Sequence, residues 1–227
     1  MELTELIRQY GKPDALIDHW DETSQSYAIW GFNEIFQINN EGKAFINSKR
    51  CNGDPIEVFQ NIIDIWKTNE KKITAIGYIS YDLKNILFPH INFNRLSNEQ
   101  PLLWFGKPKN IVPYNNTKKQ TSNNLSKIKI IKDFPIISNY KKSIDLIKKY
   151  LKLGETYQIN FSQPKEYHLA INPLSTYLSM REEIQPHYGF YINFNSVHIL
   201  SFSPERFFRK KNDTIESFPM KGTRPRS

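Results

Sequence analysis

The sequence predicts an α+β fold built mainly on antiparallel β-sheets flanked by helices. Segments with a helical hydrophobic period and segments typical of strands are mixed without the regular alternation that parallel sheets require. Near the C-terminal end, strand-like runs at 188–194 and 197–202 are separated only by Asn195 and Ser196, which is typical of a β-hairpin. With 227 residues, 39% of them hydrophobic and 14% aromatic, the chain can bury a substantial core.

The first region, up to about residue 106, contains one expected helix and one expected strand. Residues 54–70 repeat apolar side chains on one helical face, and Asp54 is placed to cap the first turn. The run 73–83 is rich in Ile and Tyr and predicts a largely buried strand. In this strand Gly77 would allow the close approach of a neighbouring backbone.

A change of composition predicts a linker at 107–132, where Lys, Asn, Ser, Thr and Pro occur without hydrophobic periodicity. The linker divides the chain into two regions. Residues 1–132, including the linker, form an N-terminal α+β region, and residues 133–227 form a second region.

The second region is predicted to run helix, strand, helix and then further strands. Residues 138–155 have apolar side chains at helical spacing, and Gly154 is placed to end this helix in the left-handed conformation. Residues 156–163 alternate apolar and polar side chains, which predicts a strand. A short helix is expected at 173–183, and a third strand at 206–210 follows the hairpin.

The chain carries a formal net charge of +8, from 31 Lys and Arg against 23 Asp and Glu. Such a surplus fits nucleic-acid binding, attraction of an anionic small substrate, or a solvated lysine-rich surface. The cations are scattered and no nucleic-acid-binding motif accompanies them, so no nucleic-acid partner is expected.

Cysteine usage and hydropathy predict a cytoplasmic protein without a membrane partner. The single cysteine, Cys51, cannot form an internal disulfide, and no Cys and His residues have metal-ligand spacing. The N-terminal segment is charged and lacks the apolar core of a signal peptide. No stretch reaches the ~18 apolar residues that a membrane-spanning helix needs.

Three short motifs in the second region carry the functional signal. GETYQINFSQP occupies 154–164, SPERF occupies 203–207 and FPMKGTRPR occupies 218–226. In this order they resemble the motifs of chorismate-binding enzymes, a family that includes anthranilate, aminodeoxychorismate, isochorismate and salicylate synthases. GYISYDLKN at 77–85 is similar to a further family segment. The resemblance implies an anthranilate/aminodeoxychorismate synthase-like fold that is incomplete in this chain.

Two positions separate the members of that family. Isochorismate and salicylate synthases carry a water-activating lysine where this chain has Gln158, and anthranilate synthases carry alanine where it has Lys221. The combination of Gln158 and Lys221 is similar to aminodeoxychorismate synthase component I. Anthranilate synthase component I is the alternative within the family.

The resemblance implies a role for each candidate site residue. Lys221 is the nucleophile that attacks the chorismate ring, and Glu205 is the acid that protonates the departing 4-hydroxyl group. Gln158, Gly222 and Thr223 are expected to line the substrate site. Without the ordered motifs, Glu205 and Lys221 would be interpreted as ordinary surface residues.

The resemblance also implies Mg²⁺, with glutamate ligands that lie in a part of the family sequence without a counterpart here, and a glutamine amidotransferase subunit that supplies ammonia. The implied reaction converts chorismate and ammonia to 4-amino-4-deoxychorismate for para-aminobenzoate and folate biosynthesis. Residues 188–190 are similar to part of a tryptophan pocket of some relatives. Because the sequence stops shortly after the KGT motif, we expect a truncated chain that is inactive alone. The alternative from another functional class is a non-catalytic binding module that keeps the amidotransferase-docking surface.

Overall fold

The computed structural model describes the residues 1–20, 25–67, 73–93, 100–115, 128–132, 137–163, 165–169, 171–194 and 196–219. The chain forms two compact units. The first consists of Met1–Lys118 together with Ile184–Ser227, and the second consists of Lys119–Glu183.

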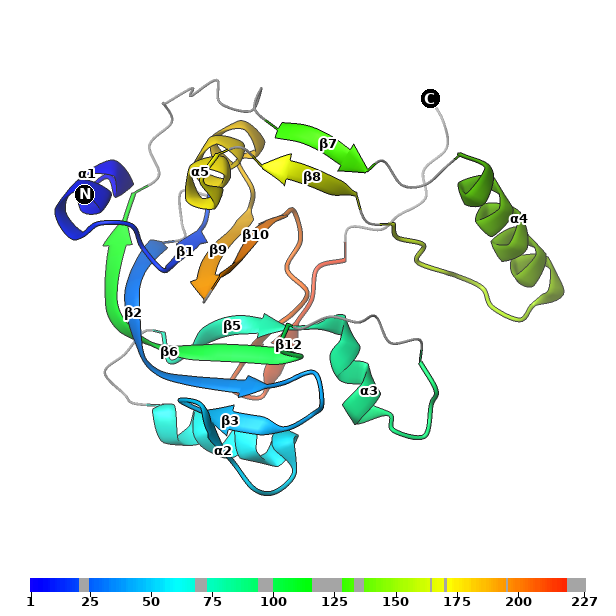
Figure 1. Cartoon of the computed structure of the whole chain (residues 1–227), viewed down its shortest axis with the longest axis horizontal. Helices are drawn as coiled ribbons and strands as arrows, with labels where there is room; N and C mark the ends of the chain where they lie inside the picture. The colour runs from blue at the N-terminus through cyan, green and yellow to red at the C-terminus, as the bar shows by residue number, and fades with distance from the viewer. Residues whose placement is uncertain are drawn as a thin grey trace. The chain divides into compact units, whose positions relative to one another are not determined.

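The first unit is built around an eight-stranded antiparallel sheet, which confirms the predicted α+β class. Its main path runs β10–β9–β1–β2–β3–β4, while β6 pairs with both β2 and β5 (Figure 1). The strands are β1 (Ala15–Asp18), β2 (Ser26–Ile38), β3 (Ala44–Ile46), β4 (Lys49–Arg50), β5 (Ile76–Ile79), β6 (Leu103–Tyr114), β9 (Tyr188–Phe194) and β10 (Val197–Ser203).

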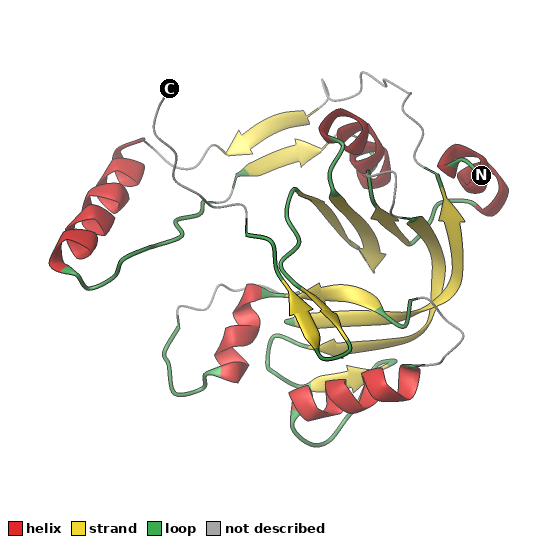
Figure 2. Ribbon diagram, turned by 180° about the vertical axis from the view of Figure 1, so that it is seen from behind, coloured by secondary structure: helices red, strands yellow, loops and turns green. Residues whose placement is uncertain are grey.

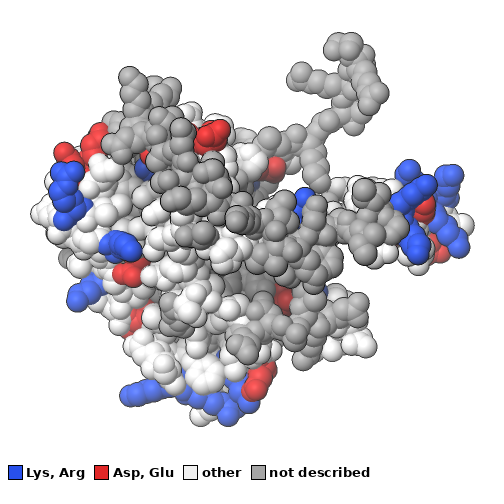
Figure 3. Space-filling view, turned by 45° about the horizontal axis from the view of Figure 1, so that its top comes forward, with Lys and Arg blue, Asp and Glu red and all other residues white. Residues whose placement is uncertain are grey.

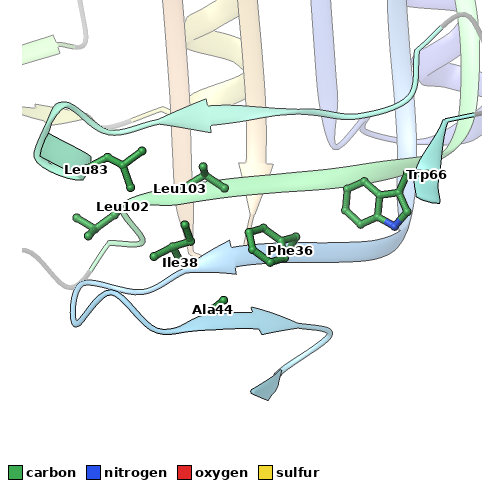
Figure 4. Packing of buried hydrophobic residues seen from close by; sticks show 7 residues of the cluster. All are labelled: Phe36, Ile38, Ala44, Trp66, Leu83, Leu102 and Leu103. Atoms are coloured by element: carbon green, nitrogen blue, oxygen red, sulfur yellow. The ribbon is translucent and has the colours of Figure 1, made fainter. Parts of the chain in front are cut away.

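Apolar side chains pack against both faces of this sheet. Leu103 belongs to one cluster and Trp104 to another, because successive side chains of a strand point to opposite faces. The first cluster, shown in Figure 4, consists of Phe36, Ile38, Ala44, Trp66, Leu83, Leu102 and Leu103. The second consists of Ala15, Ile29, Ile76, Trp104, Ile192 and Phe194.

Helix α2 (Pro55–Trp66) confirms the expected helix and its cap. The Asp54 carboxylate accepts hydrogen bonds from the backbone N–H groups of Ile56 at 2.9 Å and Glu57 at 3.0 Å. The side chain of Trp66 is buried in the first cluster, so this helix covers that face of the sheet (Figure 2). The other helices of the first unit are α1 (Leu3–Tyr10), the 3₁₀ turn η1 (Tyr81–Leu83) and α3 (Lys84–Leu87).

Strand β5 is shorter than the predicted strand 73–83, because the chain turns into η1 after Ser80. The Ser80 hydroxyl accepts a hydrogen bond from the Asp82 backbone N–H at 3.2 Å and so caps this turn. The predicted role of Gly77 is confirmed: a Cβ atom there would lie 2.0 Å from the carbonyl oxygen of Trp104.

The second unit contains the antiparallel pair β7 (Ile128–Lys132) and β8 (Glu166–Leu169) and the helices α4 (Ile137–Leu153) and α5 (Pro173–Ile184), the last residue of which counts with the first unit. These helices confirm the two expected in this part of the chain. Gly154 follows α4 with a φ of 74°, the left-handed conformation predicted for it. Among the helices that the structure describes, none is long and apolar enough to cross a membrane.

The predicted strand at 156–163 is wrong. This stretch forms neither helix nor strand, and Tyr157 near its start is 93% exposed. Alternating polarity favours a strand only when a neighbouring strand supplies the ladder hydrogen bonds. Within the described part of the chain, no strand pairs with residues 156–163.

The linker predicted at 107–132 differs from the structure at both of its ends. Residues 107–114 belong to β6, which pairs with β2 up to the contact between Tyr114 and Ser26. Residues 128–132 form β7, which pairs with β8, and residues 116–127 lie outside the described residues. The predicted division near residue 132 also differs, because β9 pairs with β1 and brings C-terminal strands into the first unit.

The predicted hairpin of β9 and β10 is confirmed by the pairing of Phe194 with Val197. The third expected strand, 206–210, is displaced along the chain. A small hairpin forms instead from β11 (Arg209–Lys211) and β12 (Thr214–Glu216), with Asn212 in its turn at a φ of 53°.

Candidate functional site

Glu205 lies in a tight turn directly after β10. Ser203 ends the strand, and its hydroxyl donates a hydrogen bond to the Glu205 carbonyl at 2.7 Å. The same hydroxyl accepts a longer bond, of 3.4 Å, from the Glu205 backbone N–H. Within the described residues, the half-buried Glu205 has no side-chain hydrogen bond or ion pair. The turn therefore fixes the Glu205 backbone and leaves its carboxylate available.

Tyr188 lies beside this turn at the start of β9. It pairs with Ser203 across the β9–β10 ladder. The guanidinium of Arg206 lies over its ring, 4.9 Å from the centroid, and the ring of His19 meets it edge-on with centroids 6.0 Å apart. Strands β9 and β10 and the residue that follows β1 thus contribute to the surroundings of Glu205.

A buried carboxylate lies at the end of β1, near Tyr188 in the sheet. Asp18 is fully buried and pairs with Gly189 of β9. The hydroxyl of Tyr114 donates a hydrogen bond of 2.5 Å to the Asp18 carboxylate. Sequence reasoning missed this pair, because the two residues are 96 positions apart and only the acid in the apolar run ALID signals it.

A second polar pair joins β9 to β10. The Tyr191 hydroxyl and His198 Nδ1 are 3.0 Å apart. Burial raises the pKa of Tyr191 to about 12, and the charge of Asp14 acts in the same direction. Burial lowers the pKa of His198, since it disfavours the charged imidazolium.

The other predicted site residues belong to the second unit or lie outside the described residues. Gln158 belongs to the second unit and is exposed, and its carbonyl accepts a hydrogen bond from the Thr156 hydroxyl at 3.0 Å. Lys221, Gly222 and Thr223 lie outside the described residues. Of the five predicted residues the structure therefore describes two, Glu205 in the first unit and Gln158 in the second.

The described residues do not provide a magnesium site. No group of three or more His, Cys, Asp or Glu side chains gathers in a metal-binding arrangement among them. Basic side chains do gather on helix α4 in the second unit (Figure 3). A shallow groove of about 470 Å³ on this helix is lined by Asp145, Lys148, Lys149, Lys152 and Leu153.

Residues 16–227 match the sequence profile of the chorismate binding enzyme family. The chain belongs to this family. The matched range covers all three motifs and the Glu205 turn, so the family resemblance seen in the sequence is confirmed.

Relatives of this chain include proteins named anthranilate synthase and proteins named aminodeoxychorismate synthase. The chain is 26% identical over 164 residues to anthranilate synthase component 1 of Saccharolobus solfataricus, a match that covers 66% of this chain and 39% of that protein. It is 34% identical over 88 residues to aminodeoxychorismate synthase of Streptomyces griseus, covering 38% of this chain and 12% of that protein. It is 30% identical over 87 residues to aminodeoxychorismate synthase component 1 of Bacillus subtilis, a match that covers 38% of this chain and 18% of that protein.

The fold is similar to that of a solved anthranilate synthase component I. Anthranilate synthase component I from Streptococcus pneumoniae matches with a TM-score of 0.54 and 14% sequence identity, covering 86% of this chain and 53% of that chain. The likeness confirms the expected fold type. The chain spans about half of this structure and 39% of the Saccharolobus relative.

Proposed function

We propose that this protein is an aminodeoxychorismate synthase component I, which converts chorismate and ammonia to 4-amino-4-deoxychorismate. One observation carries the choice within the family: Gln158 and Lys221 stand together in a chain that also holds the SPERF turn. Family membership supports chorismate as the substrate. The accessible carboxylate of Glu205 on a fixed turn suits an acid that must protonate a leaving group.

In the proposed reaction Lys221 acts as the nucleophile. Its uncharged amine bonds to the ring carbon next to the carboxylated carbon, the double bonds shift, and the C4–O bond breaks. Glu205 donates the proton with which the hydroxyl group leaves as water. Ammonia then bonds to C4, the double bonds shift back, and the bond to Lys221 breaks to release the product.

Gln158, Gly222 and Thr223 are proposed to line the ring and carboxylates of the substrate. Glutamine at position 158 matters because an amide cannot take a proton from water as a lysine amine can. Water is then not activated as a competing nucleophile, and ammonia reaches the ring. We assign the ammonia supply to a glutamine amidotransferase subunit.

Product analysis tests this proposal directly. The protein, purified from its source cells with whatever partners it has there, is incubated with chorismate and either glutamine or ammonium, and the products are identified by mass spectrometry. We expect 4-amino-4-deoxychorismate, and we expect Lys221→Ala and Glu205→Gln to abolish its formation. Arg209→Met, which changes an exposed residue outside the three motifs, is the matched control.

Anthranilate synthase component I is the second candidate, because several relatives bear that name. Anthranilate and pyruvate as products would establish it and refute the amination proposal. Retained amidotransferase binding without any binding of chorismate would instead establish a non-catalytic binding module.

A further inference from the structure

The turn that carries Glu205 is held at both ends by the same residue. Ser203, two positions before Glu205, pairs with Tyr188 in the β9–β10 ladder. Arg206, the next residue after Glu205, places its guanidinium over the ring of Tyr188 at 4.9 Å from the centroid. Tyr188 therefore anchors the chain on either side of the carboxylate.

The anchor itself is fixed by the sheet and by a neighbouring ring. Tyr188 is the first residue of β9, and the next residue, Gly189, pairs with Asp18 of β1. The ring of His19 packs against Tyr188 with its plane at 89° to the tyrosine ring. A half-buried tyrosine that is held by strand pairing and by the His19 ring has little freedom to move away from Arg206.

We propose that Tyr188 and Arg206 are positioning residues that fix the direction in which the Glu205 carboxylate projects. The hydroxyl of Ser203 hydrogen-bonds to both peptide groups of Glu205, and the Arg206–Tyr188 contact restrains rotation of the following peptide. A backbone fixed in this way keeps the carboxyl group of an acid close to the one oxygen atom that it must protonate. The catalytic meaning of this arrangement rests on the proposed function, whereas the restraint itself is a property of the turn.

Amide hydrogen exchange of the full chain, followed by NMR, tests the proposal. We expect Arg206→Met and Tyr188→Val to increase the exchange rate of the Glu205 amide by about two- to fivefold, as loss of a cation–π contact at a partly exposed site implies. Tyr188→Phe keeps the ring and should leave that rate unchanged. The exposed Arg209 is the matched control, and Arg209→Met should also have no effect on Glu205.

Exchange at Ile199, in the middle of β10, separates positioning from general loss of structure. The proposal requires that the Ile199 amide keep its parent rate in every variant. Unchanged exchange at Glu205 in Arg206→Met would overturn it, and so would an equal increase at Glu205 and Ile199. If the exchange results agree but Glu205→Gln still aminates chorismate, the proposed function fails while the restraint on the turn stands.

Discussion

The buried carboxylate of Asp18 makes the hydroxyl of Tyr114 important for stability. We expect Tyr114→Phe to lower the free energy of unfolding by about 1–3 kcal/mol, because the buried side chain of Asp18 loses a short hydrogen bond inside the protein. Urea denaturation monitored by tryptophan fluorescence measures this loss. Tyr81→Phe, at a tyrosine that is 86% exposed, should leave the midpoint unchanged, and equal midpoints for the two variants would contradict the account.

His198 should make stability depend on pH. Its pKa in the folded protein is lowered by burial from a usual value of 6.5, so the unfolded chain binds more protons just below that pH. The contribution of His198 is therefore present above about pH 6.5 and is lost as the pH falls through the lowered pKa.

The measurement compares unfolding midpoints at about pH 7.5 and about pH 5.5. We expect His198→Gln to reduce the loss of stability between these two conditions, while His90→Gln, at an exposed histidine, should keep the parent difference. A parent and a His198→Gln variant with the same pH dependence would show that burial of this ring has no energetic effect.

Single residues with local roles could be predicted from the sequence, and residues with distant partners could not. The cap formed by Asp54 depends on residues two and three positions away, and the pattern of the sequence contains them. Asp18 depends on Tyr114, which only the pairing of β2 and β6 brings close. The motif predicted Glu205 as a site residue. It did not predict that the neighbouring Arg206 contacts the ring of Tyr188.

At the scale of secondary-structure elements, the close packing of β5 on β6 depends on Gly77. A Cβ atom at this position would lie 2.0 Å from the Trp104 carbonyl oxygen and 2.8 Å from Phe105 Cα, both of them backbone atoms. We expect Gly77→Ala to destabilise the protein by about 1–3 kcal/mol or more, because the two strands must move apart. Thermal unfolding followed by circular dichroism measures the effect.

Ile79→Thr, on the same strand, is the matched control for this substitution. The side chain of Ile79 is 57% exposed and threonine keeps the branched Cβ that suits a strand, so only a small shift is expected. A Gly77→Ala variant as stable as Ile79→Thr would mean that β5 and β6 are not packed as closely as described.

Elements were predictable where one segment determines its own structure. The apolar stripe and cap of α2 and the left-handed Gly154 after α4 are local features, and both predictions are confirmed. The alternation at 156–163 was equally clear in the sequence. It failed as a strand prediction because a strand also needs a partner, which the pattern of one segment cannot specify.

At the scale of the whole molecule, large apolar side chains remain exposed near the Glu205 turn and the β11–β12 hairpin. Phe207 is 86% exposed and Phe218 is 68% exposed. Exposed aromatic side chains of this kind promote association. We expect the double variant Phe207→Ser and Phe218→Ser to lower the average mass measured by sedimentation velocity at high protein concentration.

The double variant should also keep the thermal unfolding midpoint of the parent, since neither side chain is in the core. Tyr81→Ser, which removes an equally exposed aromatic ring far along the sequence, serves as the control for general changes of solubility. If all three proteins sediment alike, these phenylalanines do not drive association.

The organisation of the molecule was only partly predictable. The fold class followed from the mixture of helical and strand patterns. The predicted division into two regions near residue 132 differs from the two units of the structure. Pairing of β9 with β1 joins residues 188–194 to the first strand of the chain, and no local change of composition marks such a contact.

The most direct test of the central claim is the search for a covalent intermediate on Lys221. The protein from its source cells is incubated with chorismate in the absence of glutamine and ammonium, and its intact mass is then measured. We predict a species heavier by one chorismate less one water, absent in Lys221→Ala and strongly reduced in Glu205→Gln. No such species, or one that persists in Lys221→Ala, would contradict the account.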